Sequence, residues 1–183
     1  CSVRRQRQMC IRDRLSITSH SNVTGIGNNI KKLTKMAHDY GIRVCVDACQ
    51  TAGTHEFDPY TVDWAVFSGH KMYGPTGVGV LYSRHPYERY RTVRQGGGSV
   101  VHYDFNGNIE YYDGPAKHEV GTPNIAGILG MGVAAEWINF LGYDKMAEHF
   151  TDIDFAMSDT DIFNIKGLNL IYPSYRQNGR YVY

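Results

Sequence analysis

Apolar residues along this chain occur in short runs that alternate with polar segments. Runs at residues 15–18, 42–46, 64–67 and 78–82 are rich in branched or aromatic side chains and predict four strands. Between the first two runs, apolar side chains recur with helical spacing over residues 30–40. This order of strand, helix, strand and strand predicts an α/β fold with a mostly parallel sheet, flanking helices and functional residues at the strand ends.

The predicted helix at 30–40 has recognisable ends. Asn28 or Asn29 precedes its first apolar position, and asparagine favours the cap at the amino end of a helix. Gly41 follows its last apolar position, where glycine accommodates the left-handed backbone that ends many helices. These caps support a helix that connects the first two strands.

The second half of the chain predicts two further helices, at 125–141 and 144–155, and a strand at 168–172. Residues 83–118 contain three consecutive glycines and many tyrosines without a clean period, so we expect an irregular segment there. We expect a large domain over residues 15–144, and the start of a small α+β carboxyl-terminal domain over 145–183.

Composition and charge narrow the class of protein. Of the 183 residues, 42% are hydrophobic and 20% are charged, which is typical of a globular chain, and the net charge of +1 favours neither nucleic acid nor a membrane surface. No apolar run is long enough to predict a membrane span. Five arginines in residues 1–14 form a basic segment, which we interpret as a leader or artefact; a nucleic-acid-binding arm is the alternative.

The cysteines predict neither a disulfide framework nor a metal site. Cys45 and Cys49 are spaced C-x3-C without a second such pair, Cys1 and Cys10 lie in the basic segment, and the histidines are scattered. Thiols of this kind are typical of a reducing compartment, so we expect a cytoplasmic protein.

The most informative segment is residues 66–82, where Lys71 directly follows a predicted strand and enters a glycine-rich loop. A lysine placed in this way can be desolvated, so that its neutral amine is available to form a Schiff base. A surface lysine in a hairpin loop is the simpler interpretation of Lys71 taken alone.

Residues near Lys71 and at the end of the preceding strand favour the first interpretation. Asp47 ends its strand, and a carboxylate there can hold the pyridine nitrogen of pyridoxal phosphate (PLP) protonated. Ser68 and His70 flank Lys71 and are placed to bind a phosphate, while Gln50 is placed to reach the phenolic oxygen. A helix cap for Asp47 and a solvated loop position for Gln50 are the alternatives, but the combination favours a PLP site.

These motifs resemble the class V aminotransferase family of fold-type I PLP enzymes, in particular its cysteine desulfurase and selenocysteine lyase branch. The resemblance extends over about residues 16–183 and rests on segments 46–50, 68–82, 96–99 and 119–124. It implies part of the large PLP-binding domain of that fold, followed by the start of the small domain.

The resemblance also implies a role for each matching residue. Lys71 is similar to the lysine that forms the Schiff base, and Asp47 to the partner of the pyridine nitrogen. Asn22 and Gln50 are similar to ligands of the phenolic oxygen, and Ser68 and His70 to ligands of the phosphate. Thr122 is similar to the phosphate ligand that reaches across from the other subunit, which implies a homodimer.

The implied function is PLP-dependent removal of sulfur from L-cysteine, giving alanine and an enzyme persulfide for a sulfur-acceptor protein, as in iron–sulfur cluster assembly. Alternatives within the family are an aminotransferase, an epimerase or a selenocysteine lyase; a non-catalytic module or nucleic-acid binder is a remote alternative.

Several departures from the family pattern affect this expectation. Asp47-Ala-Cys-Gln50 replaces Asp-Gly-Ala-Gln, and Lys117-His118-Glu119 replaces Arg-Phe-Glu. The family's ring-stacking residue, nucleophilic cysteine and carboxylate-binding arginine have no counterpart, and neither Cys45 nor Cys49 matches that nucleophile. We therefore expect the 183-residue chain to be part of a larger enzyme and to be inactive alone.

Overall fold

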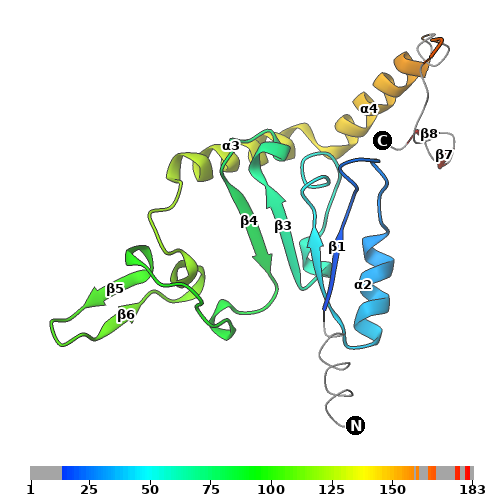
Figure 1. Cartoon of the computed structure of the whole chain (residues 1–183). Coiled ribbons are helices and arrows are strands. Elements are labelled where there is room, and N and C mark those ends of the chain that lie inside the picture. Colours follow the sequence, from blue (N-terminus) through cyan, green and yellow to red (C-terminus); the bar gives the residue numbers. More distant parts are fainter. Residues whose placement is uncertain (1–13, 159, 161–164, 168–175, 178–179, 182–183) are drawn as a thin grey trace.

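The computed structural model describes residues 14–158, 160, 165–167, 176–177 and 180–181 (Figure 1). The helices and strands are β1 (Arg14–Thr18), α2 (Ile30–Asp39), β2 (Arg43–Asp47), β3 (Trp64–Ser68), β4 (Gly79–Ser83), β5 (Val100–Tyr103), β6 (Ile109–Tyr111), α3 (Ile125–Leu141), α4 (Tyr143–Ser158), β7 (Arg176–Gln177) and β8 (Arg180–Tyr181). Short 3-10 turns include η2 (Gly69–Met72) after β3 and η5 (Gly114–His118) before α3.

The main sheet has the strand order β1-β2-β3-β4. The first three strands are parallel, with Thr18 beside Asp47 and Asp47 beside Val66, and β4 is antiparallel to β3. The predicted α/β fold with a mostly parallel sheet is therefore confirmed. Because β1, β2 and β3 run in the same direction, the polar segments that follow them share one edge of the sheet, where α3 also passes (Figure 1).

The connection from β1 to β2 contains α2, which packs along one face of the sheet (Figure 1). Of the two candidate caps, it is Asn29 whose side chain accepts a hydrogen bond from the backbone N–H of Lys32. Gly41 has a φ of 69°, which fits its predicted place just beyond the helix.

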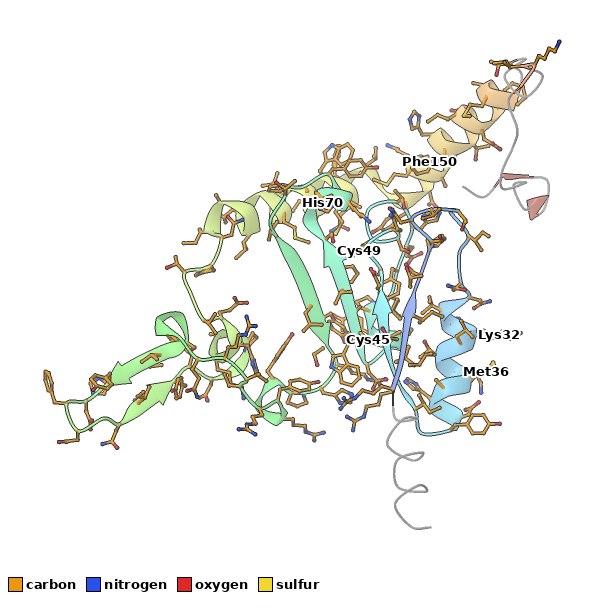
Figure 2. The ribbon with its side chains drawn as sticks, in the orientation of Figure 1. Lys32, Met36, Cys45, Cys49, His70 and Phe150 are labelled. Carbon is orange, nitrogen blue, oxygen red and sulfur yellow. The ribbon has the colours of Figure 1, made fainter. Side chains whose placement is uncertain are left out.

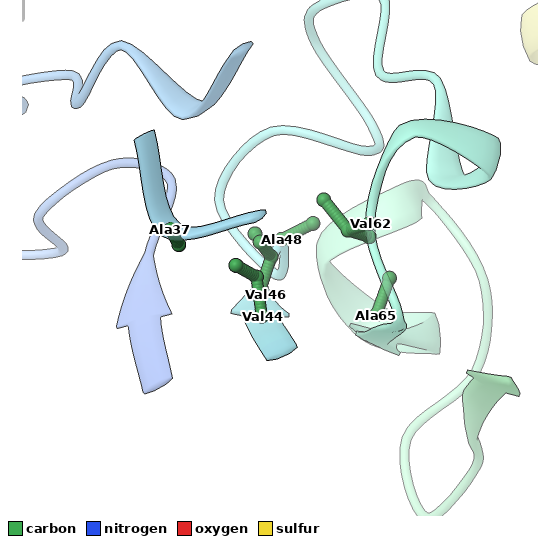
Figure 3. Packing of buried hydrophobic residues seen from close by; sticks show 6 residues of the cluster. All are labelled: Ala37, Val44, Val46, Ala48, Val62 and Ala65. Atoms are coloured by element: carbon green, nitrogen blue, oxygen red, sulfur yellow. The ribbon is translucent and has the colours of Figure 1, made fainter. Parts of the chain in front are cut away.

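The core lies between α2 and the inner strands (Figure 3). Val44 and Val46 are fully buried, whereas the intervening Cys45 is half-buried on the opposite face of β2. Ala37 of α2 packs in the same cluster, and its short side chain lets the helix approach the strand closely. The core is completed by Ala48, Val62 and Ala65.

A buried carboxylate organises the edge of the sheet where β2 and β3 begin. Oδ2 of Asp63 accepts the backbone N–H of Val44 at 2.8 Å and lies 2.9 Å from Nε2 of His38. Its Oδ1 lies 2.8 Å from Nε2 of His85. Burial alone would raise the pKa of Asp63, but these hydrogen bonds outweigh it and hold the pKa below its usual range.

The expectation of an irregular segment over 83–118 is wrong in one part. Strands β5 and β6 form an antiparallel hairpin that projects from the main sheet (Figure 1). Its turn is built by Asp104, whose carboxylate accepts the backbone N–H groups of Asn106 and Asn108 at 2.9 and 2.8 Å, and by Gly107, which has a φ of 89°. Turn chemistry therefore identifies this hairpin better than its strands do, because β5 lacks a clear alternation.

The predicted helices of the second half are present as α3 and α4. Asn124 caps α3 by accepting the backbone N–H of Gly127 at 3.0 Å. The proposed division at residue 145 falls in the first turn of α4 and stays a prediction, and the predicted strand at 168–172 lies outside the described residues. Within the described chain, no single helix is long and apolar enough to cross a membrane; α3 and α4, bent by 78°, meet that criterion only together.

Candidate active site

The ends of three neighbouring parallel strands bring the predicted site residues to one edge of the sheet. The loop after β1 carries Asn22, the turn after β2 carries Gln50, and η2 after β3 carries Lys71. Figure 2 shows His70 and Cys49 at this edge, whereas Cys45 lies toward the opposite end of β2. In open α/β sheets this edge is where ligands bind.

Asn22, Gln50 and Lys71 meet at one point. The side-chain amide of Gln50 donates a hydrogen bond to Oδ1 of Asn22, and Nζ of Lys71 donates to the same oxygen at 3.4 Å. Because these residues are separated by up to 49 positions along the chain, only the parallel sheet places them together. At 3.4 Å the hydrogen bond from Nζ of Lys71 to Asn22 is weak, so a ligand that bonds the amine more strongly can replace it.

Asp47 is exposed at the end of β2, and within the described structure its carboxylate is contacted by groups of Cys49. Oδ1 accepts the backbone N–H of Cys49 at 3.0 Å. The backbone oxygen of Asp47, in contrast, accepts the N–H of Ser19 at 2.8 Å and its hydroxyl at 3.0 Å. The backbone is therefore well held, while the carboxylate retains capacity to accept further hydrogen bonds.

Cys49 links the turn after β2 to the end of β3. Its sulfur lies 3.2 Å from Oγ of Ser68 and 3.9 Å from the backbone oxygen of Val66. Burial raises the pKa of Cys49, and the hydrogen bond and charge of Asp47 add to this effect. A thiol in this state is protonated near neutral pH, so its environment favours a hydrogen-bonding role over that of a nucleophile.

The loop that carries Lys71 is closely packed, and glycines make this possible. A Cβ atom on buried Gly53 would overlap the backbone oxygen of Lys71, and one on Gly69 would lie 2.8 Å from Cγ1 of Val78. Tyr73, directly after η2, has a φ of 62°, which is uncommon for a residue with a side chain. Its ring packs on Trp137 of α3 with centroids 5.2 Å apart, so α3 helps to hold the lysine loop.

His70 and Thr122 are placed differently from the other candidates. His70 is exposed beside Lys71 at the same edge (Figure 2). Thr122 is exposed just before α3 and makes no hydrogen bond within the described part of the chain; its neighbour Asn124 donates to the backbone oxygen of Gly77 at 3.4 Å. The structure therefore does not bring Thr122 into contact with the amides around Lys71.

The residues at this edge fit PLP on chemical grounds. An amine, an available carboxylate, and side-chain amides stand at adjacent strand ends, which matches a cofactor with an aldehyde, a pyridine nitrogen and a phenolic oxygen. Ser68 and the backbone of the turn η2 supply hydrogen-bonding groups next to the lysine, as a phosphate requires.

The sequence did not predict the side chains that hold the loop after β1 and the turn after β2 in place. A polar network joins the two segments through Ser19, His20 and Thr51. The hydroxyl of Tyr143 donates to the backbone oxygen of Ala52, in the turn after β2, at 3.1 Å. Thr51 stands next to Gln50 in the sequence, which was the one available signal. The other contacts depend on the packing of distant segments.

The α/β sheet with a lysine after its third strand is that of a fold-type I PLP enzyme. The sequence pattern of the family described as aminotransferase class-V matches residues 12–182, and the chain belongs to this family. This confirms the family resemblance that the sequence motifs indicated.

Among curated relatives, a cysteine desulfurase of Escherichia coli is 35% identical over 166 residues, which cover 88% of this chain and 40% of that protein. This chain thus spans about 40% of the length of the curated relatives that it matches.

Solved structures agree with these sequence relatives. The apo structure of a cysteine desulfurase from Thermococcus onnurineus has a TM-score of 0.70 at 30% identity, covering 79% of this chain and 38% of that one. An S-sulfonic acid form of a cysteine desulfurase from Escherichia coli has a TM-score of 0.64 at 32% identity, covering 80% of this chain and 38% of that one.

Proposed function

We propose that this chain carries the PLP-binding part of a cysteine desulfurase, which removes sulfur from L-cysteine and leaves alanine and an enzyme persulfide. The observation that carries the proposal is the meeting of Lys71 with Asn22 and Gln50 beside the available carboxylate of Asp47. The cysteine desulfurases among its relatives support the choice of substrate.

In this proposal, Lys71 has two functions. Its amine holds the cofactor covalently, and when free it accepts and returns a proton at Nζ during the reaction. The bound cofactor would supply an electron sink for the electron pair released when a bond at the substrate Cα breaks. The close packing of Gly53 under the Lys71 backbone supports both functions, because it fixes the origin of the side chain.

The other residues bind and orient. Asp47 accepts the N–H of the pyridine ring and keeps that nitrogen protonated, while Asn22 and Gln50 hold the phenolic oxygen. Ser68 and His70 bind the phosphate, with the Ser68 hydroxyl oriented by Cys49. Thr122, exposed before α3, contributes to the phosphate site of a second copy of the chain, so the proposed enzyme is a homodimer that passes sulfur to an acceptor protein.

A second candidate is another class V activity, namely an aminotransferase, an epimerase or a selenocysteine lyase. The observation that favours this candidate is the departure from the family pattern at Lys117-His118-Glu119. Lys117 and His118 lie in η5, which ends a few residues before the Gly121-Thr122 segment of the proposed site. These alternatives share the PLP site and differ in the substrate.

The proposal is tested with the protein as its gene encodes it. Borohydride reduction followed by peptide mapping is expected to place the reduced cofactor on Lys71, and Lys71→Ala to abolish both the label and alanine production from L-cysteine. Lys145→Ala, which changes an exposed lysine of α4, is the matched control and keeps both. A label on another lysine would overturn the site assignment. Labelled protein that transaminates or epimerises amino acids, without releasing sulfur, would support the second candidate.

A further inference from the structure

A chain of hydroxyl groups connects the loop that carries Asn22 to the turn that carries Gln50. Oγ1 of Thr51 contacts Oγ of Ser19 and lies 3.0 Å from Nδ1 of His20. Ser19 and Thr51 are 1% and 5% exposed, so neither hydroxyl has bulk water as an alternative partner. The proposed function assigns no role to these side chains.

The direction of each hydrogen bond follows from counting protons. Oγ of Ser19 lies 3.0 Å from the backbone oxygen of Asp47, which can only accept, so the one hydroxyl proton of Ser19 is used there. Thr51 must then donate its own proton to Ser19. With that proton used, the contact with His20 requires that Nδ1 of the imidazole carries a proton and donates it to Thr51.

The loop that begins with these residues is closed on itself. The backbone N–H of Asn28 donates to the oxygen of Ser19 at 2.7 Å, and that of Ser21 donates to the oxygen of Ile26 at 2.9 Å. His20 pairs with Gly27 across the loop, where a Cβ atom would lie 2.6 Å from Nε2 of the imidazole. Because the loop is closed by these contacts, the placement of Asn22 depends on the placement of Ser19 and His20 at the start of the loop.

The turn after β2 is equally well held at Thr51. The backbone N–H of Thr51 donates to the oxygen of Ala48 at 3.0 Å, and that of His55 donates to the oxygen of Thr51 at 2.8 Å. Since Gln50 is the preceding residue, the Thr51 side chain links the turn to the loop directly beneath the contact between Gln50 and Asn22.

The imidazole of His20 is suited to a fixed hydrogen-bond direction. Burial lowers its pKa, and the neighbouring His55, whose ring stacks on it with centroids 5.0 Å apart, lowers it further. The ring is therefore mainly neutral at neutral pH, where the proton occupies one nitrogen or the other.

We propose that Thr51 is a positioning residue of the candidate site: its hydroxyl holds His20 as the Nδ1–H tautomer and holds Ser19, just after β1, against the backbone oxygen of Asp47. In this way it keeps Asn22 opposite Gln50. The role in positioning rests on the proposed function, whereas the tautomer of His20 follows from the network alone.

The test compares Thr51→Val, which keeps the shape and removes the hydroxyl, with Thr51→Ser, which keeps the hydroxyl. Proton–nitrogen correlation spectra of the histidine side chains are expected to show the Nδ1–H form of His20 in wild type and Thr51→Ser, and its loss in Thr51→Val. Titration with PLP, followed by visible absorbance, is expected to give about tenfold weaker binding for Thr51→Val, which corresponds to the loss of about one buried hydrogen bond. Thr51→Ser is expected to stay within about twofold of wild type.

Each result separates the two parts of the proposal. An Nε2–H form of His20 in wild type would overturn the network, and a lost tautomer with unchanged PLP binding would overturn the positioning role. Wild-type protein without a PLP label on Lys71 would refute the proposed function and the positioning role with it. The protonated nitrogen of His20 would still show whether the hydrogen-bond network of Thr51 exists.

A second pair of variants covers the case in which Thr51→Val does not fold. His20→Asn keeps a donor near the position of Nδ1 and is expected to bind PLP like wild type. His20→Leu removes the donor and is expected to weaken PLP binding about tenfold. Equal affinities of these two variants would overturn the proposal.

Discussion

Asp47 and Asp63 lie at opposite edges of the same sheet, one at the end of β2 and the other just before β3. The side chain of Asp63 is 8% exposed and meets a backbone N–H and two imidazoles. Asp47 is exposed, and its carboxylate accepts one backbone N–H in the described structure.

The difference shows that a carboxylate at one edge of the sheet stabilises the fold, while a carboxylate at the opposite edge is available to a ligand. At the edge where β2 and β3 begin, the carboxylate joins α2, β2 and the segment after β4, and its partners leave it little capacity for a ligand. At the edge where they end, the backbone of Asp47 is fixed and its exposed carboxylate keeps capacity for a further hydrogen bond, which is what a cofactor partner requires. Substituting the two residues should therefore have opposite consequences.

The largest effect is expected from Asp47→Ala. In the protein as its gene encodes it, loss of the partner of the pyridine nitrogen is expected to lower turnover about a thousandfold or more, equivalent to about 4 kcal/mol of transition-state stabilisation. The midpoint of urea unfolding is expected to stay near that of wild type, because the side chain is exposed. Turnover is measured as alanine production from L-cysteine, and near-normal turnover would refute the role assigned to Asp47.

Asp63→Ala is expected to lower the stability of the fold while leaving cofactor binding intact. It leaves the N–H of Val44 without its acceptor and removes the anchor of His38 and His85, at an expected cost of about 2–4 kcal/mol in the free energy of unfolding. Urea unfolding followed by circular dichroism measures this loss. The fraction that remains folded is expected to keep the PLP label on Lys71, and a stable variant that loses the label would contradict the division between the edges.

The acid dependence of stability sharpens the same comparison. The pKa of Asp63 is lower in the folded chain than its unfolded value of about 3.9, so its stabilisation is fully present above about pH 5 and is lost as pH falls through the unfolded and then the folded pKa. Asp63→Asn, which cannot titrate, is expected to lose less free energy of unfolding between pH 6 and pH 3 than wild type. Parallel losses in the two proteins would show that Asp63 does not carry this dependence.

The smallest effect is expected from Asp39→Asn, which changes an exposed carboxylate at neither edge. Asp39 forms a surface ion pair with Lys35 one helical turn away, at 3.0 Å. Such pairs contribute at most about 0.5 kcal/mol, so neither the free energy of unfolding nor turnover is expected to change measurably. A loss as large as that of Asp63→Ala would mean that charge alone, rather than burial, explains the difference between the carboxylates.

The fold was predicted from the sequence where local signals are strong. The four strands of the main sheet, the helix over 30–39 and the glycine after it follow from periodicity and residue type, and the structure shows them. Of the two candidate caps, Asn28 and Asn29, the structure selects Asn29. The hairpin of β5 and β6 was missed, because its strands are short and only the turn at Asp104 and Gly107 carries a clear signal.

The candidate site was predicted in part. Asp47 and Lys71 were recognised as residues at strand ends, whereas Asn22 came from the family resemblance. The contact of Cys49 with Ser68 and the network of Ser19 and Thr51 were not predicted, since they join residues 19 and 32 positions apart.

The sequence by itself determined which chemical groups follow each strand, because strand ends and glycine-rich turns are local features of the chain. Only the tertiary structure decided which of these groups have partners. The packing of α2 and of the segment after β4 places two imidazoles on Asp63, just before β3, and leaves Asp47, at the end of the neighbouring β2, exposed. Burial and hydrogen bonding depend on what distant segments bring to a position, and these neighbours determine whether a carboxylate supports the fold or remains available for chemistry.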